Sequence, residues 1–278
     1  MTAPPGGSLA GSWGGDPGVL AALLVATGLY VYGARRRPAP LAARSRGRDV
    51  AFAGAIATLV VALASPVDAA AQYLLWPHML QHMLLVQLAA PLLVVARPVP
   101  TMERALPLRA RRALARVARR PTARVARRLA FNPLIAFFLL AATWWAWHSP
   151  ALYDAAVRNG ALHALEHLTF LATGVCWWAC IVGPHRAPAP QRLALLLATA
   201  LHLNVLGALI TLTPRPVYSA YHGAYGLSAL EDQQLAGVLM WVVGGFVALG
   251  LLLAFVSSIL REEPEPGAAP ARPRLVHM

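Results

Sequence analysis

Long apolar stretches, separated by shorter polar and charged segments, form the main pattern of this chain. Seven of these stretches predict membrane-spanning helices, near residues 18–34, 50–66, 73–96, 130–148, 160–182, 191–213 and 230–260. Helices of such length can cross the hydrocarbon layer of a membrane, which is about 30 Å thick, because each residue adds about 1.5 Å. We therefore expect an all-α, polytopic membrane protein in which residues 18–260 form one domain, a bundle of seven transmembrane helices.

Composition and charge give this bundle an orientation. Charged residues make up 13% of the 278 residues and hydrophobic residues 58%, whereas soluble domains carry about 25% charged residues. All 24 basic residues are arginines: six lie in 35–48, eleven in 97–128, two in 186–192 and three in 261–274. Only Arg158 and Arg215 lie in the loops expected on the other side of the membrane. Cytoplasmic loops carry such an excess of positive charge. We therefore expect the N-terminus outside the cytoplasm and the C-terminus inside it.

The segments outside the spans carry further expectations. Residues 1–17 lack the positively charged start of a cleavable signal peptide, so they predict an extracytoplasmic N-terminal segment. In the cytoplasmic arginine-rich loop 97–130, Pro107 and Pro121 predict the starts of two short helices, which suit an anionic lipid surface or, alternatively, a docking partner. Residues 261–278 predict a disordered cytoplasmic tail. Despite the net charge of +13, nucleic-acid binding is not expected, because no aromatic residues interleave with the arginines.

Ionisable residues inside the predicted spans are the strongest chemical signal. Such side chains are costly in a membrane and usually face the interior of a bundle. Seven of them are expected toward the outer ends of four spans: His78, His82, His148, His163, Glu166, His167 and Asp232. Their convergence on one side of the membrane predicts a metal-binding site there. The alternative is that each histidine reaches the membrane interface or bonds a neighbouring helix.

Two of these spans share the spacing H-x-x-[Q/E]-H, as HMLQH at 78–82 and HALEH at 163–167. On a helix the two histidines lie about 40° apart, and the Gln or Glu lies about 60° to the other side, so all three share one face. Two such faces turned toward one another would present four imidazoles, a carboxylate and an amide. Imidazole pairs suit zinc, copper or iron, and a neighbouring carboxylate can orient a ring.

Sulfur-containing side chains bear on the identity of the metal. Met79 and Met83 form a further i,i+4 pair, and thioethers prefer Cu(I), although methionine is also an ordinary core residue. Cys176 and Cys180 are expected to be small core residues, with Cu(I) binding from the cytoplasmic side as the alternative. The tyrosines of the outer loop 214–234 are expected to form an aromatic belt at the membrane surface.

Three segments of the chain also resemble a known family. The segments HMLQHMLLVQLAAPLLVVARP at 78–98, WHSPALYDAAVRNGALHALEHLTFLATGVCWW at 147–178 and YGLSALEDQQLAGVLMW at 225–241 are similar to the seven-span CtaG-type cytochrome c oxidase assembly factors of Bacillus and actinobacteria. The resemblance implies a role in assembling a haem–copper oxidase in the bacterial cytoplasmic membrane, at or near copper insertion, with oxidase subunits as partners. It implies no catalytic residues.

The sequence therefore predicts a non-enzymatic assembly factor that binds copper, as Cu(I), at its outer histidines within the lipid bilayer. Zinc and haem are the alternative ligands. Three other functions stay open: a membrane zinc metallohydrolase, a haem-binding protein and a copper transporter. The metallohydrolase is considered because H-x-x-E-H is a zinc-protease spacing, in which Glu166 would be the base. A retinal protein is excluded because the chain has no lysine for a Schiff base.

Overall fold

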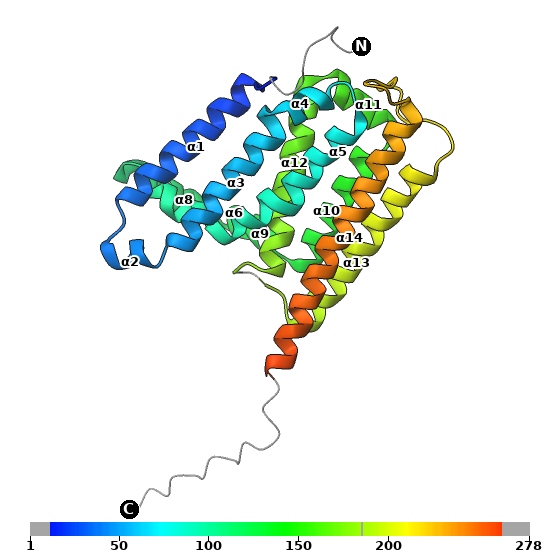
Figure 1. Ribbon diagram of the computed structural model, residues 1–278. Helices are drawn as coiled ribbons and strands as arrows, with labels where there is room; N and C mark the ends of the chain where they lie inside the picture. Colours follow the sequence, from blue (N-terminus) through cyan, green and yellow to red (C-terminus); the bar gives the residue numbers. More distant parts are fainter. Residues whose placement is uncertain (1–11, 185, 263–278) are drawn as a thin grey trace, which may run out of the picture.

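The computed structural model describes residues 12–184 and 186–262, and over these residues the chain is a bundle of helices without a strand (Figure 1). The elements in chain order are α1 (Pro17–Arg35), α2 (Ala39–Ala43), α3 (Arg46–Ala64), α4 (Pro66–Ala71), α5 (Leu75–Met83), the π-helical turn η2 (Leu84–Ala89), α6 (Ala90–Ala96), α7 (Pro98–Glu103), α8 (Leu108–Ala118), α9 (Pro121–Ala130), α10 (Pro133–Trp147), α11 (Pro150–Arg158), α12 (Gly160–Ile181), α13 (Ala189–Leu212) and α14 (Ala229–Glu262).

Six segments of the described chain are long and apolar enough to cross a membrane: α1, α3 with α4, α5 through α6, α12, α13 and α14. A seventh is counted if α9 and α10 form one span, and these two helices are bent by 72° at their junction. The all-α membrane bundle predicted from the hydropathy pattern is thus confirmed. The predicted fourth span, 130–148, corresponds to α10, which Asn132 caps and which reaches spanning length only together with α9.

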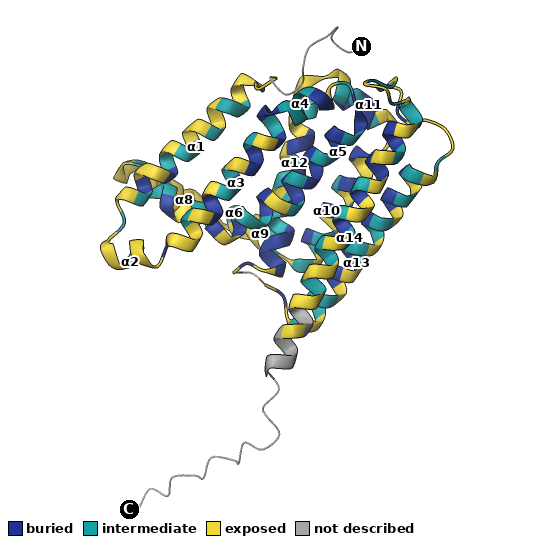
Figure 2. Ribbon diagram, viewed as in Figure 1, coloured by how far each residue is buried: buried dark blue, intermediate teal, exposed yellow. Residues whose placement is uncertain are grey.

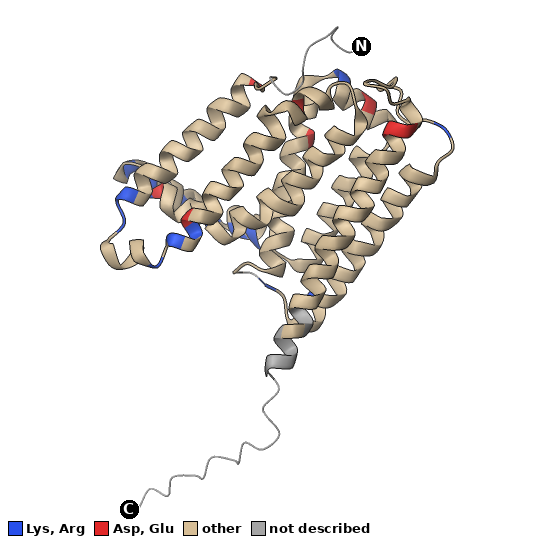
Figure 3. Cartoon of the chain, in the orientation of Figure 1, with Lys and Arg blue, Asp and Glu red and all other residues tan. Residues whose placement is uncertain are grey.

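The arginine-rich loop contains three helices. Pro107 directly precedes α8 and Pro121 begins α9, as the sequence predicts. Both helices expose apolar side chains beside their arginines: Leu114, Val117, Val125 and Leu129. Figure 3 shows most arginines at the end of the bundle that contains α2, α8 and α9, and acidic residues mainly at the opposite end. Residues 1–11 and most of the predicted tail, from 263 onward, lie outside the described residues.

The buried core runs along the middle of the bundle, where α5, α10, α12, α13 and α14 pack together (Figure 2). Helices α13 and α14 approach closely at Gly207 and Gly237: a Cβ at position 237 would collide with α13, and a Cβ at position 207 would pack tightly against α14. Small residues allow such close packing where lipid gives no hydrophobic driving force between helices. The outer surfaces of α1, α13 and α14 expose large apolar side chains, as expected of surfaces that contact lipid.

One span is interrupted by a π-helical turn directly after its histidine pair. Pro91 follows this turn and has no N–H to donate to the preceding carbonyls. The indole Nε1 of Trp178, on α12, donates instead to the carbonyl oxygen of Val86 at 2.7 Å. The irregularity is therefore compensated by a neighbouring helix, and it ties the histidine-bearing α5–α6 segment to α12.

Candidate metal centre

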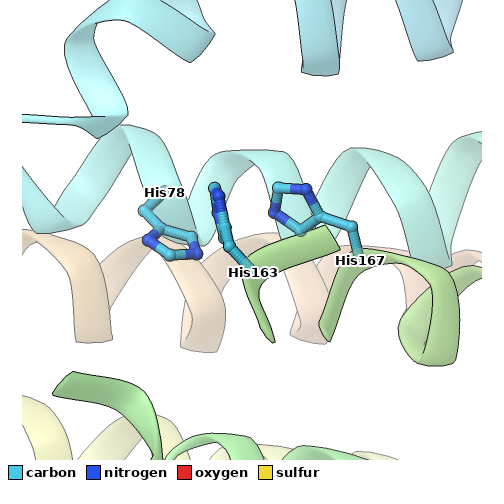
Figure 4. Close-up of side chains that lie close together, drawn as sticks. All are labelled: His78, His163 and His167. Atoms are coloured by element: carbon cyan, nitrogen blue, oxygen red, sulfur yellow. The ribbon is translucent and has the colours of Figure 1, made fainter. Parts of the chain in front are cut away.

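The two H-x-x-[Q/E]-H segments meet between α5 and α12 (Figure 4). The ring centroids of His78 and His82 lie 4.5 Å apart, and those of His163 and His167 lie 4.2 Å apart. Between the helices, the His78 ring lies 4.9 Å from that of His163 and 5.8 Å from that of His167. The i,i+4 spacing thus gives each helix one imidazole-bearing face, and the bundle turns the two faces together.

Glu166 joins the four rings from α12. Its Oε1 lies 3.4 Å from His82 Nε2, and its Oε2 lies 3.6 Å from His78 Nε2. The carboxylate is fully buried. We refer to His78, His82, His163, His167 and Glu166 as the histidine cluster.

The histidine cluster contains potential ligand atoms that lack protein hydrogen-bond partners among the described residues. They are Nε2 of His78, both ring nitrogens of His82, Nε2 of His163, Nε2 of His167 and both oxygens of Glu166. Two sets could each hold an ion, His78 with His163 and His167, and His78 with His82 and Glu166, with ligand atoms within 4.8 Å of one another. Buried polar groups are costly unless they are paired or coordinate a metal. The donor set therefore fits a metal ion.

Two tyrosine hydroxyls contact the ring of His78. His78 Nδ1 lies 2.8 Å from the hydroxyl of Tyr153 and 3.0 Å from that of Tyr221, which itself donates to the carbonyl of Ala71 at 2.8 Å. Burial raises the pKa of both phenols above its ordinary value, so each keeps its proton at neutral pH. With its proton on Nδ1, His78 can donate to these oxygens and leave the lone pair of Nε2 facing the cluster.

The outer loop is folded into the protein and does not form the expected aromatic belt. Tyr218 and Tyr221 are buried, and of the three tyrosines only Tyr225 is exposed. Asp154 on α11 anchors the loop, because it accepts hydrogen bonds from the backbone of Ser219 and Ala220. Sequence reasoning missed Tyr153 and Tyr221, and their only signal was that tyrosines lay close to spans rich in histidine.

Two polar residues of the predicted site have other roles. Asp232 on α14 accepts hydrogen bonds from the backbone N–H of Leu75 (2.7 Å) and Trp76 (3.0 Å), so it caps the N-terminus of α5 and does not face the cluster. Gln81 donates to the carbonyl of Ala62 (2.7 Å) and to Asp68 (2.8 Å), which turns its amide toward α3 and α4. We therefore exclude both from the candidate metal centre.

The two methionines of the predicted site point to different neighbours. Met79 is buried, and its Sδ lies 3.1 Å from Nε2 of His148, at the end of α10. The end of the Met83 side chain lies near Gly244 on α14 instead, where it is part of the buried core. Only Met79 therefore has a histidine nitrogen beside its sulfur among the described residues.

A cavity of about 320 Å³ reaches the histidine cluster from the end of the bundle where α1 begins. Its lining includes His78, His163 and His167 at the inner side and Asp16 and Asp68 nearer α1 and α4. Asp16 is exposed and caps α1. The cavity thus joins the cluster to an exposed acidic side chain.

Comparison with known proteins identifies the family. The profile described as cytochrome c oxidase caa3 assembly factor matches residues 28–262. Uncharacterized proteins of Mycobacterium bovis and Mycobacterium tuberculosis are each 28% identical over 260 residues, which cover 90% of this chain and 39% of each relative. The chain thus spans about two fifths of the length of these curated relatives. No solved structure matches it at a significant level. Since the matched region includes both histidine segments and most of the bundle, the chain belongs to the cytochrome c oxidase caa3 assembly factor family.

Proposed function

We propose that this chain binds copper at the histidine cluster and passes it to a cytochrome c oxidase during assembly, without catalysing a reaction. The observation that carries the proposal is the set of buried ligand atoms, without a hydrogen-bond partner among the described residues, that α5 and α12 bring together inside an apolar bundle. A membrane protein gains nothing in stability from such groups unless something binds them. Membership of a cytochrome c oxidase assembly factor family supports copper as the ligand.

The donor set suits copper as cargo. Neutral imidazoles bind Cu(I) and Cu(II) well, and the carboxylate of Glu166 offsets one positive charge in a low-dielectric surrounding. His78 contributes to both possible ligand sets, so an ion can exchange partners within the cluster by small movements. A transfer protein needs ligands that bind and also release.

Access to the cluster comes from the end opposite the arginines. The cavity lined by Asp16 and Asp68 places negative charge along the route of a cation. The arginines at the opposite end support a cytoplasmic location for that end, by the positive-inside rule. We therefore infer that copper enters and leaves on the outer side of the bacterial cytoplasmic membrane.

The position of Glu166 favours transfer over hydrolysis. A hydrolytic base needs a water molecule beside a metal-bound substrate. Glu166 is instead enclosed between the two histidines of α5, and its whole side chain is buried. A carboxylate so placed orients imidazoles and balances charge.

The proposal is tested by His78→Ala, His163→Ala and their double variant, in cells that lack the native copy. Copper per purified chain and active oxidase in the membranes are the two readouts. In a shared site the first loss already disables binding, so all three variants should lose the same amount of copper and of active oxidase relative to the wild type. His202→Ala is the matched control, because His202 is a partly buried span histidine whose ring packs against Phe137 outside the cluster.

The control should retain copper and oxidase. Near-normal copper in either single variant, with additive loss in the double, would show independent or structural histidines. That result would end the shared-site proposal.

A further inference from the structure

Outside the histidine cluster, one pair of buried side chains has an arrangement that protein contacts alone do not explain. The imidazole Nε2 of His148, at the end of α10, lies 3.1 Å from the thioether sulfur of Met79 on α5. Met79 is completely buried and His148 is 5% exposed. No other sulfur in the described residues has a histidine nitrogen within hydrogen-bonding distance.

The protons of this pair can be assigned from its other contact. His148 Nδ1 lies 2.8 Å from the backbone carbonyl oxygen of Trp144, which can only accept, so Nδ1 carries a hydrogen. In a neutral imidazole Nε2 then carries a lone pair. The sulfur of Met79 also has only lone pairs to offer. Two acceptors therefore face each other at 3.1 Å with no donor between them.

The surroundings do not favour a charged histidine. A second proton on Nε2 would place an imidazolium among aromatic rings, with Trp144 and Phe170 at centroid distances of 5.2 and 6.2 Å. Glu166 lies in ion-pair distance of His78 and His82, and no carboxylate pairs with His148 among the described residues. A buried charge without a partner is expensive. A soft cation shared by nitrogen and sulfur satisfies both groups.

We propose that Met79 and His148 form a second metal site, selective for Cu(I) and separate from the histidine cluster. An ion about 2.0 Å from nitrogen and about 2.3 Å from sulfur separates two donors by about 3.1 Å when their angle is a right angle. The unbranched Met79 side chain can widen this angle by small rotations. Thioether sulfur selects Cu(I) over zinc, whereas imidazoles and a carboxylate accept either.

This site goes beyond the proposed function and does not rest on it. The histidine cluster supplies nitrogen and oxygen ligands only, so a metal–sulfur bond reports on the second site alone.

The test is X-ray absorption at the copper edge on the purified full chain, loaded with Cu(I) under reducing conditions. The wild type should show a sulfur neighbour at about 2.3 Å. Met79→Leu should abolish it, and so should His148→Phe, which removes the other ligand. Met83→Leu is the matched control, since Met83 is an equally buried methionine one turn along α5. It should keep the sulfur signal.

Unfolding midpoints of the variants show whether each is folded. The absence of a sulfur neighbour in the wild type would overturn the proposal, as would an unchanged signal in folded Met79→Leu. Equal loss in folded Met79→Leu and Met83→Leu would also overturn it, because the sulfur would then not belong to this pair. Undiminished copper in the His78 variants, with the sulfur signal intact, would contradict only the cluster.

Discussion

Tyr153 offers a sharp test of how the protein prepares His78 to bind a metal. Its hydroxyl lies 2.8 Å from Nδ1 of His78, and the Tyr221 hydroxyl lies 3.0 Å from the same atom. Partners of this kind fix the tautomer and orientation of a ligating histidine, and their loss typically weakens metal affinity by about 10–100-fold, or about 1.4–2.7 kcal/mol. Since one tyrosine can stand in for the other, Tyr153→Phe should cost about 10-fold and the Tyr153→Phe, Tyr221→Phe double variant nearer to 100-fold.

The assay is a competition titration of the purified chain with Zn(II), which the thioether of Met79 does not attract. Tyr218→Phe is the control, because this tyrosine is buried in the same loop but donates to the backbone carbonyl of His148. It should leave Zn(II) affinity unchanged. An unchanged affinity in the double variant would refute the reasoning, and an equal loss in Tyr218→Phe would show that loop packing, not the contact to His78, is responsible.

Three further predictions concern the carboxylates and the topology. Glu166→Gln should weaken metal affinity by about 10–100-fold and leave partial oxidase assembly, whereas full metal occupancy without oxidase would favour the hydrolase. Asp232→Ala should lower the free energy of unfolding in detergent by about 3 kcal/mol, because two backbone N–H groups of α5 lose their acceptor. A change under about 0.5 kcal/mol would contradict that capping role. Reporter fusions after residues 115 and 187 should report cytoplasm and those after 155 and 222 the outside, and a cytoplasmic signal at 155 would contradict the proposed orientation.

Most of the fold was predictable because lipid imposes one simple requirement on the sequence. A span must be apolar over its whole length, so hydropathy locates it without knowledge of its neighbours. The start of the fourth span was hard to predict, since the amphipathic α9 runs almost directly into α10 and only Phe131 and Asn132 separate them. The π-helical turn after Met83 was not predictable, because it depends on the indole of Trp178 from another helix.

The candidate site was predictable only where it follows helix periodicity. The spacing of 78–82 and 163–167 placed two imidazoles on one face of each helix, and no further information was needed for that. Gln81 shows what helix periodicity does not predict. A helix face about 100° wide contacts more than one neighbouring helix, and Gln81, at the edge of the histidine face of α5, bonds to α3. The contacts of Tyr221 and Asp232 join residues more than 140 positions apart, which no local pattern encodes.

The central claim is that this chain binds copper, and the metal content of the purified wild-type protein tests it most directly. Elemental mass spectrometry and an absorption spectrum of one preparation, from cells grown with copper, separate copper, zinc and haem. The account predicts at least one copper ion for each chain and no haem absorption. A preparation that is fully folded but contains only zinc or haem, or no metal at all after copper loading, would contradict it.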